Sequence, residues 1–158
     1  MRQRRRLRPY AYRVLCSGAL ASLASAAAAL LCSRIENRHA AQPMNAVAHI
    51  YDGGRPRRHD GVNGRNTALG FAIHTGASLW WALFFEALPK RSTGETLAHG
   101  AALSAGAYVI DYYVVPRRFR PGFEVALGPR SLFAVYAALA AGFCASAITR
   151  RARRRSPA

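Results

Sequence analysis

The chain has 158 residues, of which 51% are hydrophobic, and its net charge is +16 because 23 Lys and Arg residues stand against only 7 acidic ones. Most of the apolar residues gather in four long runs, which leaves no room for a separate water-soluble domain. The arginines cluster at the edges of these runs and do not alternate with aromatic residues on one face. That arrangement argues against a nucleic-acid-binding protein and makes anionic lipid headgroups the expected partner of the charge.

Each of the four runs is nearly free of ionisable side chains and is about 20 residues long, the length that a helix needs to cross a ~30 Å hydrocarbon core. They cover residues 14–33, 67–88, 96–115 and 131–149. We therefore predict an all-α integral membrane protein with four transmembrane helices in one compact bundle. A cleaved secretory signal is the alternative for the first run, but its apolar part is longer than a usual signal core and favours an uncleaved helix.

Basic residues near the ends of the runs predict the orientation. Thirteen lie on the side that would hold both termini and ten on the other side, and all but one of the 23 are arginine, as in GC-rich bacterial genes. We therefore expect a bacterial inner-membrane protein with both termini in the cytoplasm. The side chains expected to contact lipid headgroups are Arg4, Arg5, Arg6, Arg117, Arg118, Arg151 and Arg153.

The first loop, residues 34–66, is too long to be a simple connector. Its apolar residues from Met44 to Tyr51 follow the i, i+3, i+4, i+7 pattern of a short amphipathic helix over residues 41–51, lying on a membrane or folded back on the bundle. The segment RPRRHDG that begins at Arg55 is expected to be an irregular charged stretch. Three histidines recur every ten residues, which is not a metal-ligand spacing, so we expect them to be solvated. They are His39, His49 and His59.

The second and third runs should form an antiparallel hairpin. Pro89 ends the second run, and Ser92 and Glu95 have the spacing of a capping box that opens the third. Pro116 ends the third run and Pro129 opens the fourth. Small residues at four-residue spacing predict tight helix packing on the first and fourth helices. They are Gly18, Ser22, Ala26, Ala134, Ala138, Gly142 and Ser146.

Four ionisable residues lie within the second and third runs, where they should face the bundle interior and find partners. His74 and Asp111 are equally distant from the centre of the predicted turn, and so are Glu86 and His99. Two acid–histidine pairs at matched depths are therefore predicted. The two residues on each helix differ in rotation by about 120°, so both pairs cannot face the same seam.

The deeper pair, His74 with Asp111, has three interpretations: a hydrogen-bonded clamp that fixes helix register, a proton relay, and a metal site completed by a loop histidine. The first favours a small non-enzymatic accessory or structural membrane protein. The others favour a proton-linked or metal-linked transporter or channel, which at this size would need a homo-oligomer or a membrane partner. No complete catalytic motif is present, so we expect neither an enzyme nor a cofactor, and we assign no resident metal.

Three segments carry a resemblance to a known family. They are PMNAVAH at 43–49, GFAIHTGASLWWALFFE at 70–86 and DYYVVPRRFRPGFE at 111–124. In these segments the chain resembles a family of small four-span bacterial inner-membrane proteins and, more distantly, the YagU-like inner-membrane proteins. The resemblance implies the four-span topology and marks His74, Asp111 and Glu124 as parts of its motifs. It implies no activity.

Overall fold

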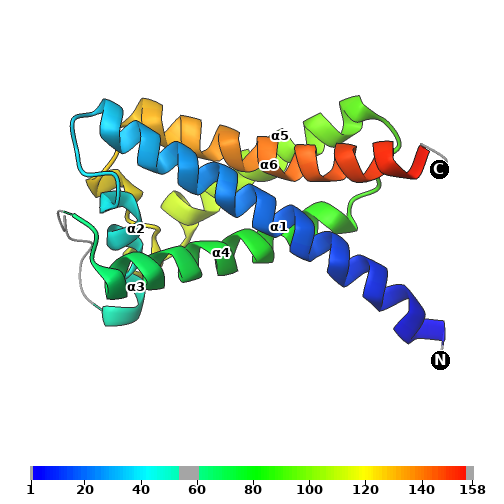
Figure 1. The fold of residues 1–158 in the computed structure, drawn as a ribbon, viewed down its shortest axis with the longest axis horizontal. Coiled ribbons are helices and arrows are strands. Elements are labelled where there is room, and N and C mark those ends of the chain that lie inside the picture. The colour runs from blue at the N-terminus through cyan, green and yellow to red at the C-terminus, as the bar shows by residue number, and fades with distance from the viewer. Residues whose placement is uncertain (1, 54–60, 156–158) are drawn as a thin grey trace.

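The computed structural model describes residues 2–53 and 61–155, with side chains described between residues 9 and 153. This part of the chain is all-helical and contains no strand, as the sequence predicts. Four long rods lie side by side, and the short helices gather at one end of them (Figure 1). The elements are α1 (Arg2–Ile35), α2 (Gln42–Val47), α3 (His49–Asp52), α4 (Gly64–Ala87), α5 (Thr93–Val109), the π-helix η1 (Ile110–Val114), the 3₁₀ turns η2 (Arg117–Phe119) and η3 (Phe123–Val125), and α6 (Pro129–Arg155).

Three of these helices are long and apolar enough to cross a membrane: Pro9–Ile35, Gly64–Ala87 and Pro129–Arg153. They coincide with the first, second and fourth apolar runs. The third run is also helical, but α5 has only 17 residues before it passes directly into η1. The four-rod arrangement is therefore made of three long helices and one composite rod.

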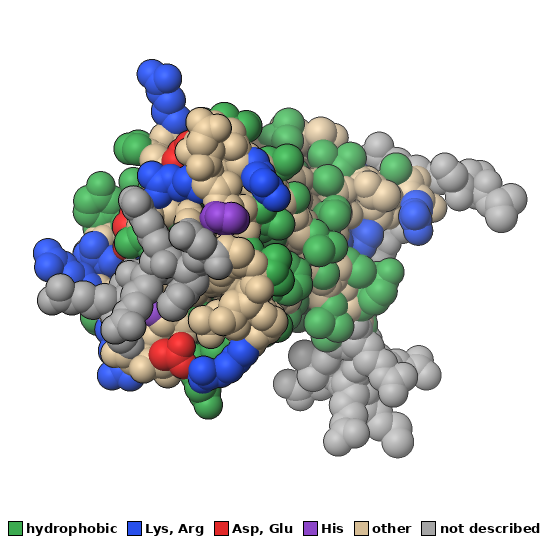
Figure 2. Space-filling view, turned by 60° about the vertical axis from the view of Figure 1, so that its left-hand side comes forward, with side chains coloured by type: hydrophobic (Ala, Val, Ile, Leu, Met, Phe, Trp, Pro, Cys, Tyr) green, Lys and Arg blue, Asp and Glu red, His purple; other side chains and the backbone are tan. Residues whose placement is uncertain are grey.

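Helix α1 buries mainly small side chains, and many large apolar side chains lie on the outside of the bundle. Ser17, Ala21, Ser22 and Ala29 of α1 are fully buried. Large exposed residues on the helix flanks include Leu15, Leu23, Leu31, Trp80, Phe84, Leu97, Val109 and Phe133. Apolar side chains cover the middle of the molecule, and charged residues lie toward its ends (Figure 2). Small interior residues allow helix axes to approach closely, which is the packing mode of helices in lipid.

The predicted small-residue packing is confirmed at two glycines. A Cβ added at Gly142 of α6 would overlap the backbone of Ala21, and one at Gly18 of α1 would overlap Leu79 of α4. Ser22 of α1 also lies within 2.9 Å of the Thr75 hydroxyl. As a result α1 occupies the centre of the bundle, between α6 and α4.

The connection between α4 and α5 is short, as predicted, and Ser92 caps α5 as in the predicted capping box, while Glu95 bonds one residue further back than the box requires. The Ser92 hydroxyl accepts a hydrogen bond from the N–H of Glu95 (3.0 Å), and the Glu95 carboxylate accepts one from the N–H of Arg91 (2.7 Å). Beyond this turn the two helices diverge, because α4 packs on α1 whereas α5 packs on α6. The predicted seam between the second and third helices is therefore short.

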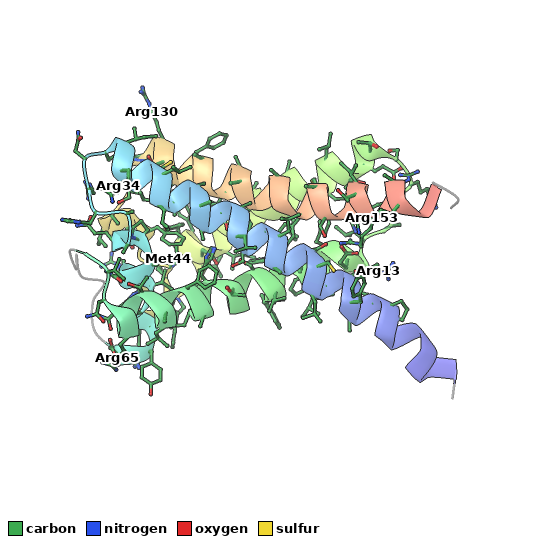
Figure 3. All side chains as sticks on the ribbon, in the orientation of Figure 1. Arg13, Arg34, Met44, Arg65, Arg130 and Arg153 are labelled. Atoms are coloured by element: carbon green, nitrogen blue, oxygen red, sulfur yellow. The ribbon has the colours of Figure 1, made fainter. Side chains whose placement is uncertain are left out.

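The short helix predicted at 41–51 is present as α2 and α3. Every residue of α2 is buried, so this segment is folded back on the bundle. It crosses α4 at Gly70, where an added Cβ would overlap the carbonyl group of Met44. The arginine-rich segment that begins at Arg55 lies outside the described residues. Arg34, Arg65 and Arg130 lie at this end of the bundle, and Arg13 and Arg153 lie at the other end (Figure 3).

Glu36 joins the end of α1 to the start of α6. Its carboxylate accepts hydrogen bonds from the Ser131 hydroxyl (2.5 Å) and from the N–H of Gly128 (3.0 Å). Helix N-termini favour negative charge because their first N–H groups lack partners within the helix. The Ser131 hydrogen bond is the main cause that lowers the pKa of Glu36 below its usual 4.5.

Glu36 should therefore make stability depend on pH. Because its pKa is lower in the folded state, its contribution is complete above pH 4.5 and is lost as the pH falls through the folded-state value. We expect Glu36→Gln to lower the melting temperature in detergent at pH 7 and to differ less from the wild type at pH 3. Glu95→Gln, which removes a charge from an exposed cap, is the matched control. An equal difference between Glu36→Gln and the wild type at both pH values would contradict this assignment.

Candidate functional site

Four polar side chains, each from a different element, line one small cavity. Ser25 comes from α1, His74 from α4, Asp111 from η1 and Tyr136 from α6, and the rest of the lining is mostly apolar and includes Phe123 of η3. We call these first four residues the polar centre. The cavity has a volume of about 100 Å³. This is well below the roughly 300–1,000 Å³ of small-molecule sites and leaves space for about three water molecules.

Each ionisable residue of the polar centre has a partner on another element. The Nε2 atom of His74 lies 3.0 Å from the Ser25 hydroxyl, and its ring meets the Phe123 ring edge-on at 5.7 Å between centroids. The Tyr136 hydroxyl donates a 2.7 Å hydrogen bond to Asp111. The bonds therefore tie α4 to α1 and η1 to α6.

His74 and Asp111 do not form the predicted pair, but they line the same cavity. Both side chains line it, but among the described residues no hydrogen bond or ion pair joins them. The divergence of α4 from α5 is the reason, because it allows Phe123 and Tyr136 to enter between the two helices. Ser25 and Tyr136 supply the contacts that we expected the pair to supply itself.

Asp111 lies in a π-helical turn that sequence reasoning did not anticipate. The N–H of Val115 bonds to the carbonyl oxygen of Ile110 (2.8 Å), which is the i→i+5 pattern of a π-helix. Turns of this kind are rare in proteins, and those that occur are often located at functional sites. A π-helical turn has more residues per turn than an α-helix, so side chains within it point in different directions from those of a regular helix. The prediction that paired His74 with Asp111 assumed regular helices and did not include this change.

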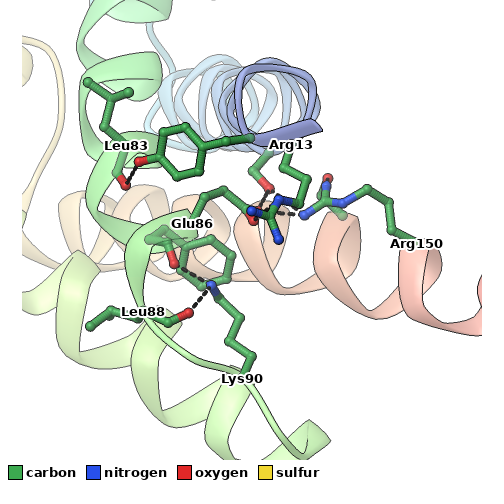
Figure 4. Close-up of polar contacts among 10 residues, drawn as sticks. Arg13, Leu83, Glu86, Leu88, Lys90 and Arg150 are labelled. Carbon is green, nitrogen blue, oxygen red and sulfur yellow. Dashed lines mark hydrogen bonds and ion pairs between the residues drawn. The ribbon is translucent and has the colours of Figure 1, made fainter. Parts of the chain in front are cut away.

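The second predicted pair, Glu86 with His99, requires correction. Glu86 accepts hydrogen bonds from the Ser17 hydroxyl and from Arg150, whose Nη2 lies 2.5 Å from the carboxylate. Only 4% of the Glu86 side chain is exposed, and Arg13 lies 3.9 Å away (Figure 4). A guanidinium is a stronger partner for a carboxylate than an imidazole, and packing of α4 on α1 directs Glu86 away from α5. His99 is half-buried, and its Nδ1 has no hydrogen-bond partner within the described residues.

A larger cavity of about 560 Å³ adjoins Glu86 at the end of the bundle that holds both termini. Its basic lining residues are Arg13, Lys90, Arg91, Arg150 and Arg151, and we call it the basic pocket. The Lys90 ammonium donates hydrogen bonds to the carbonyl oxygens of Phe85 and Leu88, as drawn in Figure 4, and lies 4.2 Å from the centre of the Phe85 ring. Burial lowers the pKa of Lys90.

The arginines predicted to contact headgroups lie at both ends of the bundle. Arg151 lines the basic pocket and Arg153 is exposed at the same end. Arg117 and Arg118 are exposed in η2, near the opposite end. The side chains of Arg4, Arg5 and Arg6 lie outside the described part of the chain. Contact with lipid stays a prediction for all of them.

The loop histidines differ from one another. His39 is exposed, as expected. His49 is buried, with its Nδ1 2.7 Å from the carbonyl oxygen of Ala46, so the expectation of a solvated side chain was wrong for this residue. The burial of the α2 and α3 segment on the bundle is the cause. His59 lies outside the described residues, and in the described part no group of three or more His, Cys, Asp or Glu side chains could hold a metal ion.

Sequence reasoning missed Ser25, Tyr136 and Arg150 as partners of the ionisable residues. A weak sequence signal for Ser25 was present, because several serines, including Ser17 and Ser22, recur along the alanine-rich first helix. Arg150 was counted only as a charge at the end of the last run. Its role depends on how the end of α6 lies beside the end of α4, and sequence periodicity does not contain that information.

The chain was also compared with protein-family models, with curated proteins and with solved structures, and none of the three comparisons finds a match. The resemblance to small four-span inner-membrane proteins therefore stays a prediction.

Proposed function

We propose that this protein is a small four-span protein of the bacterial inner membrane with both termini in the cytoplasm. The start of α6 is bonded to Glu36 near the end of α1, and the end of α6 is bonded to Glu86 near the end of α4. The chain between α4 and α6 must therefore return from one end of the bundle to the other. The rod formed by α5 and η1 makes this return, which supports a fourth crossing beside the three long apolar helices.

The molecular role that we propose is that of a non-enzymatic accessory or structural protein whose buried polar residues fix the packing of its helices. One observation carries this proposal: His74, Asp111 and Glu86 each bond to a neighbouring helix. Buried polar groups in a membrane are costly unless they are paired, and interhelical hydrogen bonds there contribute about 0.6 to 2 kcal/mol each. In this proposal the polar centre sets helix register and does not conduct or transform a ligand.

A proton-linked transporter or channel is the second candidate, and one observation favours it. His74 and Asp111 line the same cavity, which has room for about three water molecules, so a water-mediated proton path between them is geometrically allowed. Metal-linked transport has less support, because no cluster of potential metal ligands is found among the described residues.

Reconstitution into liposomes that contain a pH-sensitive dye separates the two candidates. If the polar centre is structural, an imposed pH gradient will decay at the same rate with the wild-type protein as with empty liposomes. In a double-mutant cycle of Asp111→Leu and Tyr136→Phe, each single variant should then lower stability, with a coupling of at least about 0.6 kcal/mol. Protein-dependent proton flux that His74→Leu abolishes would overturn the structural role in favour of transport.

A further inference from the structure

The basic pocket concentrates positive charge to an unusual degree. Five of its lining residues are Lys or Arg, and Glu86 is the one carboxylate among the lining residues that the structure describes. Glu86 is already bonded to Arg150 and Ser17. Like charges repel strongly where solvent is partly excluded. The pocket therefore has excess positive charge that a bound anion would neutralise.

Donor groups of three arginines in this pocket make no hydrogen bond to the rest of the fold. The Nη1 of Arg151 and the Nε of Arg13 are buried without a hydrogen-bond partner among the described residues, and the Arg13 Nε has only a long ion pair, 3.9 Å from the Glu86 carboxylate. The side chain of Arg91 is exposed and makes no hydrogen bond or ion pair with described residues, since only its backbone groups are bonded. A buried N–H group without a partner is unfavourable, and an acceptor from a ligand would relieve it. These three arginines provide donors for such an acceptor.

Chemistry and position both indicate a phosphate group. Arginine forks match the oxygens of phosphate, and basic pockets between membrane helices on the cytoplasmic side bind anionic headgroups. The apolar segments of α4 and α6 end near Ala87 and Thr149, so the pocket lies where the apolar surface of the bundle gives way to its charged end. A volume of about 560 Å³ is sufficient for a phosphodiester headgroup.

We propose that the basic pocket is a binding site for a phosphate-bearing anion. Arg13, Arg91 and Arg151 would bind this anion next to the Glu86–Arg150 pair. The phosphate can come from an anionic phospholipid headgroup or from a free phosphate compound. This inference concerns a different part of the molecule from the polar centre, and it does not depend on the accessory role.

The experiment measures binding of short-chain phosphatidylglycerol to the full chain in a neutral detergent, with short-chain phosphatidylcholine and inorganic phosphate as separate titrants. The test variants are Arg91→Gln, Arg151→Gln and the double variant, which leave the Glu86–Arg150 pair intact. The control variant is Arg117→Gln plus Arg118→Gln, because these exposed arginines lie near the opposite end of the bundle. Melting temperature and helicity are measured for each variant to verify folding.

We expect phosphatidylglycerol to bind more tightly than phosphatidylcholine and each pocket variant to weaken it about 5-fold, with about 25-fold for the double variant. The control variant should bind as the wild type does. Binding of inorganic phosphate with the same dependence on Arg91 and Arg151 would support the site and assign it to a free phosphate compound. Equal weakening by pocket and control variants, or binding of phosphatidylglycerol that none of them changes, would overturn the proposal.

Discussion

Replacing Arg150 with leucine should destabilise the protein by about 3 kcal/mol, more than any other single charge removal. Arg150 is the closest basic partner of Glu86, whose side chain is only 4% exposed, so the variant leaves a buried carboxylate without its main counter-charge. Arg13, at 3.9 Å, compensates only in part. Reversible unfolding in mixed micelles measures the change in the free energy of unfolding.

The double variant Glu86→Gln plus Arg150→Leu should be more stable than Arg150→Leu alone, because it removes the uncompensated charge and keeps a polar partner for Ser17. Arg117→Leu, at an exposed position, is the control and should change stability by less than about 0.5 kcal/mol. If the effects of Glu86→Gln and Arg150→Leu simply add, the pair is not the stabilising contact that the structure indicates.

Two glycines of the same helix should respond differently to the same substitution. Gly70→Ala places a Cβ against the carbonyl group of Met44, so α2 must move away from α4. A shift of that kind costs about 2 to 3 kcal/mol. Gly76, two turns further along α4, has open space around its Cβ position. Gly76→Ala should therefore be neutral or stabilise by up to about 1 kcal/mol, because alanine favours the helix.

Thermal unfolding in one detergent compares the two variants directly. We expect a lower melting temperature for Gly70→Ala and an unchanged or higher one for Gly76→Ala. Protease sensitivity within α2 should also increase in Gly70→Ala, since the loss of this contact releases the segment from the bundle. Equal melting temperatures for the two variants would contradict the docking of α2 on α4.

Features that depend on local sequence were predicted correctly. The apolar runs locate the long helices, the capping box at Ser92 opens α5, and the periodicity around Met44 predicts α2 and α3. Each of these features follows from spacing within about two helical turns. Two of the glycines that face a neighbouring helix, Gly18 and Gly142, were also predicted, because close packing needs small residues.

Features that depend on how helices rotate and cross were not predicted. Glu86 has Arg150 and Ser17 as partners, and His74 has Ser25, because α4 packs on α1 and its end lies beside the end of α6. The π-helical turn at Asp111 changes the register of the chain at the residue whose pairing was predicted. Depth along a helix can be calculated from residue numbers, but the direction of a side chain around the helix axis depends on the completed bundle.

Site-directed labelling of single cysteines tests the four-span topology most directly. Cys16, Cys32 and Cys144 are replaced by alanine, and single cysteines are placed at Asn37, Arg91, Arg118 and Arg153. We expect a membrane-impermeant maleimide to label positions 37 and 118 in intact cells and to label positions 91 and 153 only after permeabilisation. Labelling of positions 91 and 118 under the same condition would show that α5 and η1 do not cross the membrane and would contradict the four-span topology.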